Sequence, residues 1–131
     1  MKKLVEDWIQ FVENDLCAAE GILKYYQHLT NIIAFHCQQA TEKYMKAFLI
    51  ENNIPLVKTH DLIRLNGLII KIKELGIDEN KLMILNKIYV DSRYPGGLGM
   101  LPDGEPTVEQ AKEFVEYAKE IKTAVMVGFT S

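Results

Sequence analysis

The stretch Asn31–Asn52 constrains the fold most strongly, because its apolar residues recur at helical spacing over about six turns. At about 100° per residue, one face collects Ile33, Cys37, Ala40, Tyr44, Ala47 and Phe48. The opposite side collects the polar residues His36, Gln38, Gln39, Glu42, Lys43 and Lys46. We therefore expect a long amphipathic helix whose polar side is solvated unless a second subunit covers it.

A second long helix is predicted before this stretch, from about Lys3 to Tyr26 or His28. Its apolar stripe is expected to contain Leu4, Trp8, Phe11, Val12, Leu16, Ala19, Ile22, Leu23 and Tyr26. Asp15 lies beside the stripe, and a carboxylate there needs a partner if the helix is packed. Thr30 or Asn31 is the expected N-cap of the next helix, and so short a link makes the two helices antiparallel neighbours.

The second half of the chain predicts three more helices. Thr59 is expected to cap a third helix that closes near Gly76, and Asp78 to cap a fourth. The stretch Tyr94–Pro106 holds three Pro and four Gly residues and is predicted to be a long loop. Thr107–Gln110 then fits a capping box at the start of the last helix. The apolar residues of the third helix are expected to be Leu62, Leu65, Leu68 or Ile69, and Ile72. Those of the fourth are Leu82, Leu85, Ile88 and Tyr89, and those of the last are Val108, Ala111, Val115, Ala118, Ile121 and Val125. The sequence predicts an all-α fold, an antiparallel up-and-down bundle of four main helices plus a shorter one.

The composition narrows the class of protein. With 131 residues, of which 48% are hydrophobic and 25% charged, residues 1–131 suit a single domain with its own core. A net charge of −3 argues against a broad basic surface for long nucleic acid, but it permits a small cationic pocket. Cys17 and Cys37 are interpreted as reduced core thiols. No apolar run is long enough to cross a membrane, and the N-terminus does not resemble a signal peptide, so we expect a cytoplasmic protein.

No known cofactor or metal motif is present. The three His residues do not pair at i, i+4, and neither Cys belongs to a ligand set. There is no Walker loop and no GxSxG elbow, and Gly96–Gly99 has no strand before it. The sequence therefore predicts neither a metal site nor a cofactor.

The candidate functional residues fall in three places. His60, with Lys58 and Arg64, heads the third helix and could bind phosphate there, although capping and a surface His–Asp pair would explain it equally well. Arg93 and Tyr94 end the fourth helix, where a guanidinium could bind phosphate and a ring could stack on a base. On the second helix, His36 is a candidate base and Lys43 a candidate ligand residue, and both could instead be structural. The ligand-binding candidates are Arg93, Tyr94, Lys43, Lys58, His60 and Arg64; the catalytic candidates are Arg93, His36 and His60.

The sequence also resembles a known family. The residues that carry the resemblance are Trp8, the Asp15–Ala19 pattern, Phe35–Ile50, Pro55–Leu62 and Arg93–Tyr94–Pro95. Over the whole chain the sequence resembles the HEPN domain (higher eukaryotes and prokaryotes nucleotide-binding). The resemblance implies a helical bundle, similar to the substrate-binding domain of antibiotic nucleotidyltransferases, and often a homodimer. It also implies a nucleotidyltransferase partner, and many such pairs are toxin–antitoxin systems.

The ribonuclease members of this family share an Arg followed by four to six residues and then a His. No His follows Arg93 or Arg64 here, because the last His is His60. The resulting hypothesis is a non-catalytic module that binds a nucleotide or an RNA end and acts with a nucleotidyltransferase. The alternatives are a divergent metal-independent ribonuclease, with His36 or His60 as its base, and a purely structural interaction protein.

Overall fold

The computed structural model describes residues 1–93 and 105–130, with the side chains of residues 89–93 excepted. Within this part of the chain the backbone forms five helices and no strand. They are α1 (Lys3–Tyr25), α2 (Thr30–Glu51), α3 (Leu62–Ile70), α4 (Glu79–Arg93) and α5 (Val108–Thr130). The all-α fold predicted from apolar spacing is therefore confirmed. Most of the predicted Tyr94–Pro106 loop lies outside the described residues.

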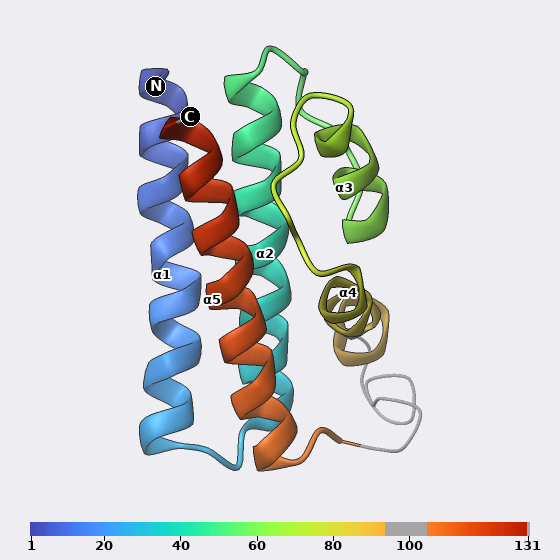
Figure 1. The fold of residues 1–131 in the computed structure, drawn as a ribbon. Helices are drawn as coiled ribbons and strands as arrows, with labels where there is room; N and C mark the ends of the chain where they lie inside the picture. Colours follow the sequence, from blue (N-terminus) through green and yellow to red (C-terminus); the bar gives the residue numbers. More distant parts are fainter. Residues whose placement is uncertain (94–104, 131) are drawn as a thin grey trace.

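Three long helices lie side by side, and two shorter ones cover part of them (Figure 1). α1 runs opposite to α2, as the short link between them predicts, and also opposite to α5, so both chain termini lie at the same end. α3 and α4 lie on the other side of α2, where α4 is seen nearly end-on and crosses the long helices. None of the described helices has both the length and the apolar character that crossing a bilayer requires.

α2 is the central helix, since it contacts each of the other four. This position corrects the expectation of a solvated polar side. Gln38, Glu42 and Lys46 are buried, with 0%, 4% and 8% of their surface exposed, because α3 and the connection before it cover them. The apolar face is buried as predicted, including Ala40 and Tyr44. The spacing of the polar residues therefore showed which of them share a side of α2, but not whether that side is buried or exposed.

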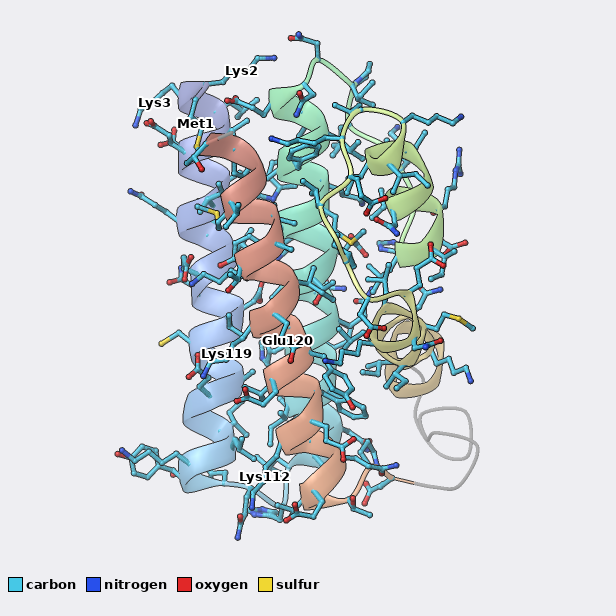
Figure 2. All side chains as sticks on the ribbon, in the orientation of Figure 1. Met1, Lys2, Lys3, Lys112, Lys119 and Glu120 are labelled. Atoms are coloured by element: carbon cyan, nitrogen blue, oxygen red, sulfur yellow. The ribbon has the colours of Figure 1, made fainter. Side chains whose placement is uncertain are left out.

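α5 contacts α1 on one side and α4 on the other, through charged residues as well as apolar ones. Lys119 pairs with Glu20 of α1 at 3.2 Å, and Glu120 pairs with Lys81 of α4 at 2.6 Å. Figure 2 labels Lys119 and Glu120 on α5, with Lys119 directed toward α1. The predicted apolar positions of α5 from Ala111 to Val125 are buried, together with Phe114.

Two of the predicted helix caps are present. The Asp78 carboxylate accepts hydrogen bonds from the backbone N–H groups of Asn80 and Lys81 at the start of α4. At the start of α5, the Gln110 N–H donates to the Thr107 hydroxyl, and the Gln110 side chain accepts from the Thr107 N–H. This reciprocal pair is the capping box that the sequence predicts.

Two other predicted caps were wrong. α3 is capped by Asp61, whose carboxylate accepts from the N–H groups of Ile63 and Arg64, while Thr59 only binds the Asp61 N–H. α2 begins after Leu29, and neither its first residue Thr30 nor the following Asn31 caps it. Gly76, with φ of 71°, lies in the α3–α4 connection rather than at the end of α3. At α3 the capping Asp61 is also bound by Asn86 of α4, so a tertiary contact supports the observed start of this helix.

The predicted core also needs correction along α1. Leu4 and Phe11 are 64% and 73% exposed, and Cys17 is exposed as well. Among the described helices, α1 contacts only α2 and α5, so it buries a narrow line of residues: Val5, Ile9, Val12, Leu16 and Ala19. Cys37 is a core thiol as predicted, and burial, with a smaller contribution from the charge of Glu20, raises its pKa to about 12.

Candidate functional site

The best-defined polar site is a cluster around Glu42, which we call the Glu42 cluster: Gln38, Glu42, Lys46 and His60. Glu42 Oε1 lies 2.8 Å from His60 Nδ1, and Glu42 Oε2 lies 3.0 Å from Lys46 Nζ. The Gln38 amide approaches Glu42 Oε1 at 3.4 Å and the backbone oxygen of His60 at 3.5 Å. The cluster thus ties the middle of α2 to the residues that precede α3.

Burial gives these contacts their importance. A carboxylate inside a protein is costly unless it is paired and hydrogen-bonded, and Glu42 has two charged or polar neighbours on one oxygen and a lysine on the other. The His60 side chain is half exposed while the Glu42 side chain is only 6% exposed. A buried carboxylate therefore fixes the orientation of a histidine ring that reaches the surface.

The Lys58–Arg64 segment places two further cations beside His60. Lys58 and Arg64 are both exposed and make no ion pair with the residues that the structure describes. The amides of the first turn of α3 are already bound, by Asp61 at Ile63 and Arg64 and by the Asn86 side chain at Leu62. An anion at this place would therefore be held by side chains rather than by the helix N-terminus.

Arg93 and Tyr94 cannot be assigned to this site from their side chains. Arg93 is the last residue of α4, and its side chain lies outside the described residues, as does the whole of Tyr94. The backbone of α4 nevertheless approaches α3, because Asn86 binds both the Leu62 N–H and the Asp61 carboxylate. Arg93 follows Asn86 by about two helical turns.

A second polar cluster lies on the α1 side of α2 and contains Asp15, His36 and Lys43; we call it the Asp15 cluster. Asp15 Oδ2 lies 2.7 Å from Lys43 Nζ, and Asp15 Oδ1 lies 3.4 Å from His36 Nδ1. The partner that Asp15 was expected to need is thus present. The three side chains are 18%, 35% and 29% exposed, in the order Asp15, Lys43 and His36.

The two clusters separate the candidate residues. Lys43 and Glu42 are adjacent on α2 and project about 100° apart, Lys43 toward α1 and Glu42 toward the connection before α3. Among the described candidates, the structure brings His36 and Lys43 together at Asp15, whereas Lys58 and Arg64 are neighbours of His60 in the sequence.

A third cluster was not anticipated from the sequence. The Tyr44 hydroxyl donates to Glu13 at 2.7 Å, and Lys122 Nζ pairs with the same carboxylate at 2.8 Å. Burial alone would raise the pKa of Glu13, but the hydrogen bonds from Lys122 and Tyr44 outweigh it, so the pKa is lowered. The signal that could have indicated this cluster is the buried Tyr44, whose hydroxyl needs a partner.

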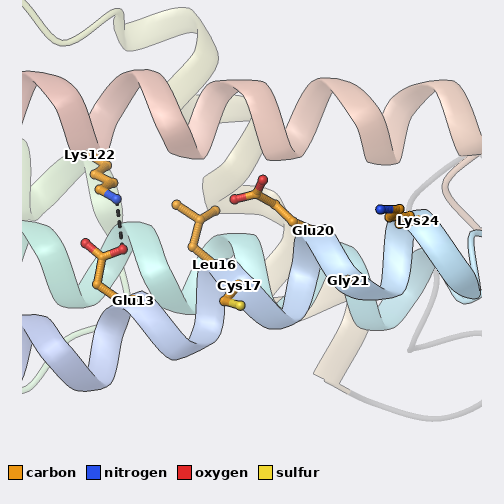
Figure 3. Close-up of a pocket in the computed structure, with 7 residues that line it drawn as sticks. All are labelled: Glu13, Leu16, Cys17, Glu20, Gly21, Lys24 and Lys122. Atoms are coloured by element: carbon orange, nitrogen blue, oxygen red, sulfur yellow. Dashed lines mark hydrogen bonds and ion pairs between the residues drawn. The ribbon is translucent and has the colours of Figure 1, made fainter.

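The Glu13–Lys122 pair lies at one end of a shallow groove of about 370 Å³ between α1 and α5 (Figure 3). The groove also contains Cys17, Glu20 and Lys24, so it has both signs of charge. Among the described residues, no three His, Cys, Asp or Glu side chains are grouped so that they could hold a metal ion. The Glu13 groove is thus a mixed-charge surface rather than a built ligand site.

Comparisons with known proteins agree with the fold. The family model of the HEPN domain matches residues 5–127. The crystal structure of an archaeal HEPN homologue is similar over 98% of both chains, with a TM-score of 0.72 and 28% sequence identity. No curated protein matches the chain. The resemblance seen in the sequence is therefore confirmed by the matched residues and by the fold, and the chain belongs to the HEPN domain family.

Proposed function

We propose that this HEPN domain is a non-catalytic module that binds a nucleotide or an RNA end and acts with a nucleotidyltransferase partner in a toxin–antitoxin pair. The observation that supports binding is the Lys58–Arg64 segment, where His60 is held by the buried Glu42 between two exposed cations. The nucleotidyltransferase, the pairing as toxin and antitoxin, the homodimer and the cytoplasmic location follow from the family resemblance and belong to the same proposal.

The chemistry of the segment favours a phosphate group. Arg64 can bind phosphate oxygens bidentately, and Lys58 adds a second positive charge that no described residue neutralises. The 2.8 Å contact with Glu42 fixes the orientation of the His60 ring between these two cations in the sequence. Arg93 and Tyr94 are part of the proposal on the sequence argument alone, as a further cation for phosphate and a ring for base stacking.

The binding test is fluorescence anisotropy with ATP analogues and with short RNA that carries a 5′-phosphate. Replacing Lys58 and Arg64 together by Ala should weaken binding about tenfold or more and reduce the salt slope by about 1 to 2, since two phosphate contacts are lost. The matched control replaces Lys24 on α1 and Lys112 on α5, two exposed lysines on other helices, and so removes the same charge. Equal losses in both double variants would reject a local site.

The second candidate function is a divergent metal-independent ribonuclease. It is favoured by the 2.8 Å contact between Glu42 and His60, because a carboxylate that orients an imidazole is the usual arrangement behind a general base. The test is RNA cleavage in EDTA with Arg93→Ala and His60→Ala as controls. Cleavage abolished by either substitution would establish the enzyme. Cleavage by none of the three proteins would leave the binding module.

A further inference from the structure

The outer side of α3 carries exposed apolar residues and cations together. Among the described helices, α3 contacts only α2 and α4, and Figure 1 shows it at the edge of the molecule, on the side of α2 opposite to α1. Ile63 and Ile70 are 38% and 46% exposed, and Arg64 and Lys71 are exposed as well. We call this surface the α3 face: Ile63, Arg64, Gly67, Ile70 and Lys71.

Helical spacing arranges these residues in two adjacent rows. Ile63, Gly67 and Ile70 follow one another at i, i+4 and i+7 and therefore form one row. Arg64 and Lys71 form a second row beside it, with about 10 Å between them along the helix axis. Lys71 caps the C-terminus of α3, and its backbone is still helical, with φ of −70° and ψ of −20°. The α3 face is thus an apolar row with one cation near each end.

Gly67 leaves a notch in the middle of the apolar row. A glycine inside a helix is less favourable than an alanine, because it loses more conformational freedom on folding. Neither packing nor backbone conformation within the described chain requires glycine here, since a Cβ at Gly67 would meet no other atom within 4 Å and its φ is not positive. The notch is therefore open to a side chain from outside, between Ile63 and Ile70.

The charges of the α3 face favour an acidic partner. Arg64 and Lys71 make no ion pair with any residue that the structure describes. Residues 62–73 contain three cations and no acidic residue, although the whole chain has a net charge of −3. The acidic residues at the two ends are hydrogen-bonded to backbone N–H groups, Asp61 at the start of α3 and Glu74 in the turn that follows it. A carboxylate from another molecule would supply the missing partner of each cation.

The apolar strip of α1 differs in this respect. The strip borders a groove of about 350 Å³ and consists of Leu4, Trp8 and Phe11. The two charged residues of that groove are paired within the chain, Asp7 with Lys3 at 2.8 Å and Lys43 with Asp15 at 2.7 Å. The borders of the α1 groove are therefore neutral and select no partner, whereas the cations of the α3 face do.

We propose that the α3 face binds an acidic amphipathic helix of a partner protein. An apolar side chain of that helix enters the notch at Gly67, while two of its carboxylates, about two turns apart, pair with Arg64 and Lys71. Exposed apolar residues beside cations suit a protein segment, because the apolar row adds contact area that a phosphate group cannot use. The inference goes beyond the proposed nucleotide site. Arg64 is common to both, but Gly67, Ile70 and Lys71 belong to the α3 face alone.

The first test selects helical peptides from a phage-displayed library on the immobilised full chain. Enriched peptides should carry an apolar residue and two carboxylates about two helical turns apart. A synthetic peptide of the enriched sequence should bind Lys71→Glu about tenfold or more weakly than the wild type. The matched control is Lys24→Glu, which reverses the charge of an exposed lysine on α1 and should bind like the wild type. Enrichment without acidic residues, or equal affinities of Lys71→Glu and the wild type, would overturn the proposal.

The second test fills the notch without changing any charge. Gly67→Leu should leave the melting temperature unchanged or raise it, because leucine is the better helix former and the space around its Cβ is open. The same substitution should weaken peptide binding about tenfold or more, since the notch is then occupied. Gly21→Leu on α1 is the matched control, because a Cβ at Gly21 also meets no atom within 4 Å. Unchanged peptide affinity in Gly67→Leu would refute the notch as the binding place.

Three further measurements on Gly67→Leu distinguish other occupants of the α3 face. Fluorescence anisotropy with short RNA should give the wild-type affinity, because Lys58 and Arg64 are retained. Cosedimentation with phosphatidylglycerol vesicles and the oligomeric state in sedimentation equilibrium should also equal those of the wild type. A loss of RNA binding, of vesicle binding or of self-association in this variant would assign the face to nucleic acid, to a membrane or to a second copy, and would refute the acidic helix.

Discussion

The Glu42 and Asp15 clusters have the same chemistry in different surroundings. Each consists of a carboxylate that contacts one lysine and one histidine, and each draws its lysine from α2. Around Glu42, the carboxylate and Lys46 side chains are only 6% and 10% exposed. Around Asp15, the corresponding values for the carboxylate and Lys43 are 18% and 35%.

This difference in burial should decide how much each cluster contributes to the stability of the fold. In water, a lysine or carboxylate that loses its partner is solvated at little cost, whereas a buried one is left without compensation. The Glu42 cluster is therefore expected to hold the fold and the His60 ring in place. The Asp15 cluster is expected to contribute little to stability.

The largest expected effect is that of Glu42→Ala. The substitution leaves Lys46 buried without its carboxylate, which should lower the free energy of unfolding by about 3–5 kcal/mol. Urea unfolding followed by circular dichroism measures the change, with Asp15→Ala as the matched control. A loss below about 1 kcal/mol would mean that Lys46 reaches water easily, and the contrast between the clusters would disappear.

Replacing both members of the buried pair sharpens the same comparison. Glu42→Met combined with Lys46→Met removes the two charges together, so no unpaired ion remains, and about half or more of the stability lost in Glu42→Ala should return. The double variant should nevertheless bind RNA more weakly, because His60 loses the carboxylate that orients it. Unfolding and anisotropy measured on the same sample would reveal both effects. Unchanged RNA affinity would remove His60 orientation from the binding proposal.

Asp15→Ala is expected to cost less than about 1 kcal/mol, because both Lys43 and His36 can be solvated once the carboxylate is gone. Added salt should narrow the gap between this variant and the wild type, since exposed pairs are screened. Unfolding in low and high salt measures the effect. A loss as large as that of Glu42→Ala would show that burial is not what separates the two clusters.

The smallest effect is expected at Glu13, which pairs with Lys122 and Tyr44 on the α5 side of α1. Its pKa is lowered in the folded state, so its contribution to stability is present above the ordinary value of 4.5 and is lost as the pH falls through the folded pKa. Glu13→Gln should therefore weaken the acid dependence of stability below about pH 4.5. Identical slopes of stability against pH in the variant and the wild type would contradict this assignment.

The helices themselves could be predicted because the information is local. Apolar spacing identified all five, and the cap of α4 and the capping box of α5 depend on residues within one turn. The choice between Thr59 and Asp61 as the cap of α3 could not be predicted in the same way. Asn86 of α4 binds both Asp61 and the Leu62 N–H, so a residue distant in the sequence takes part in the first turn of α3.

In the candidate site, too, local features could be predicted from the sequence and long-range contacts could not. His60, Lys58 and Arg64 could be proposed from the sequence because they are neighbours in it. The partner of His60 could not, because Glu42 is on another helix and was expected to be solvated. Similarly, the exposure of Leu4 and Phe11 could not be predicted, since their spacing is that of core residues.

By itself, the sequence determined the class of fold, the approximate position of each helix and the HEPN resemblance, because periodicity depends on neighbours within a few residues. Only the tertiary structure decided that α2 is central, that Glu42 and Lys46 are buried, and that one apolar strip of α1 is left uncovered. Burial depends on which helices pack against each side, and that arrangement is set by contacts between segments far apart in the chain.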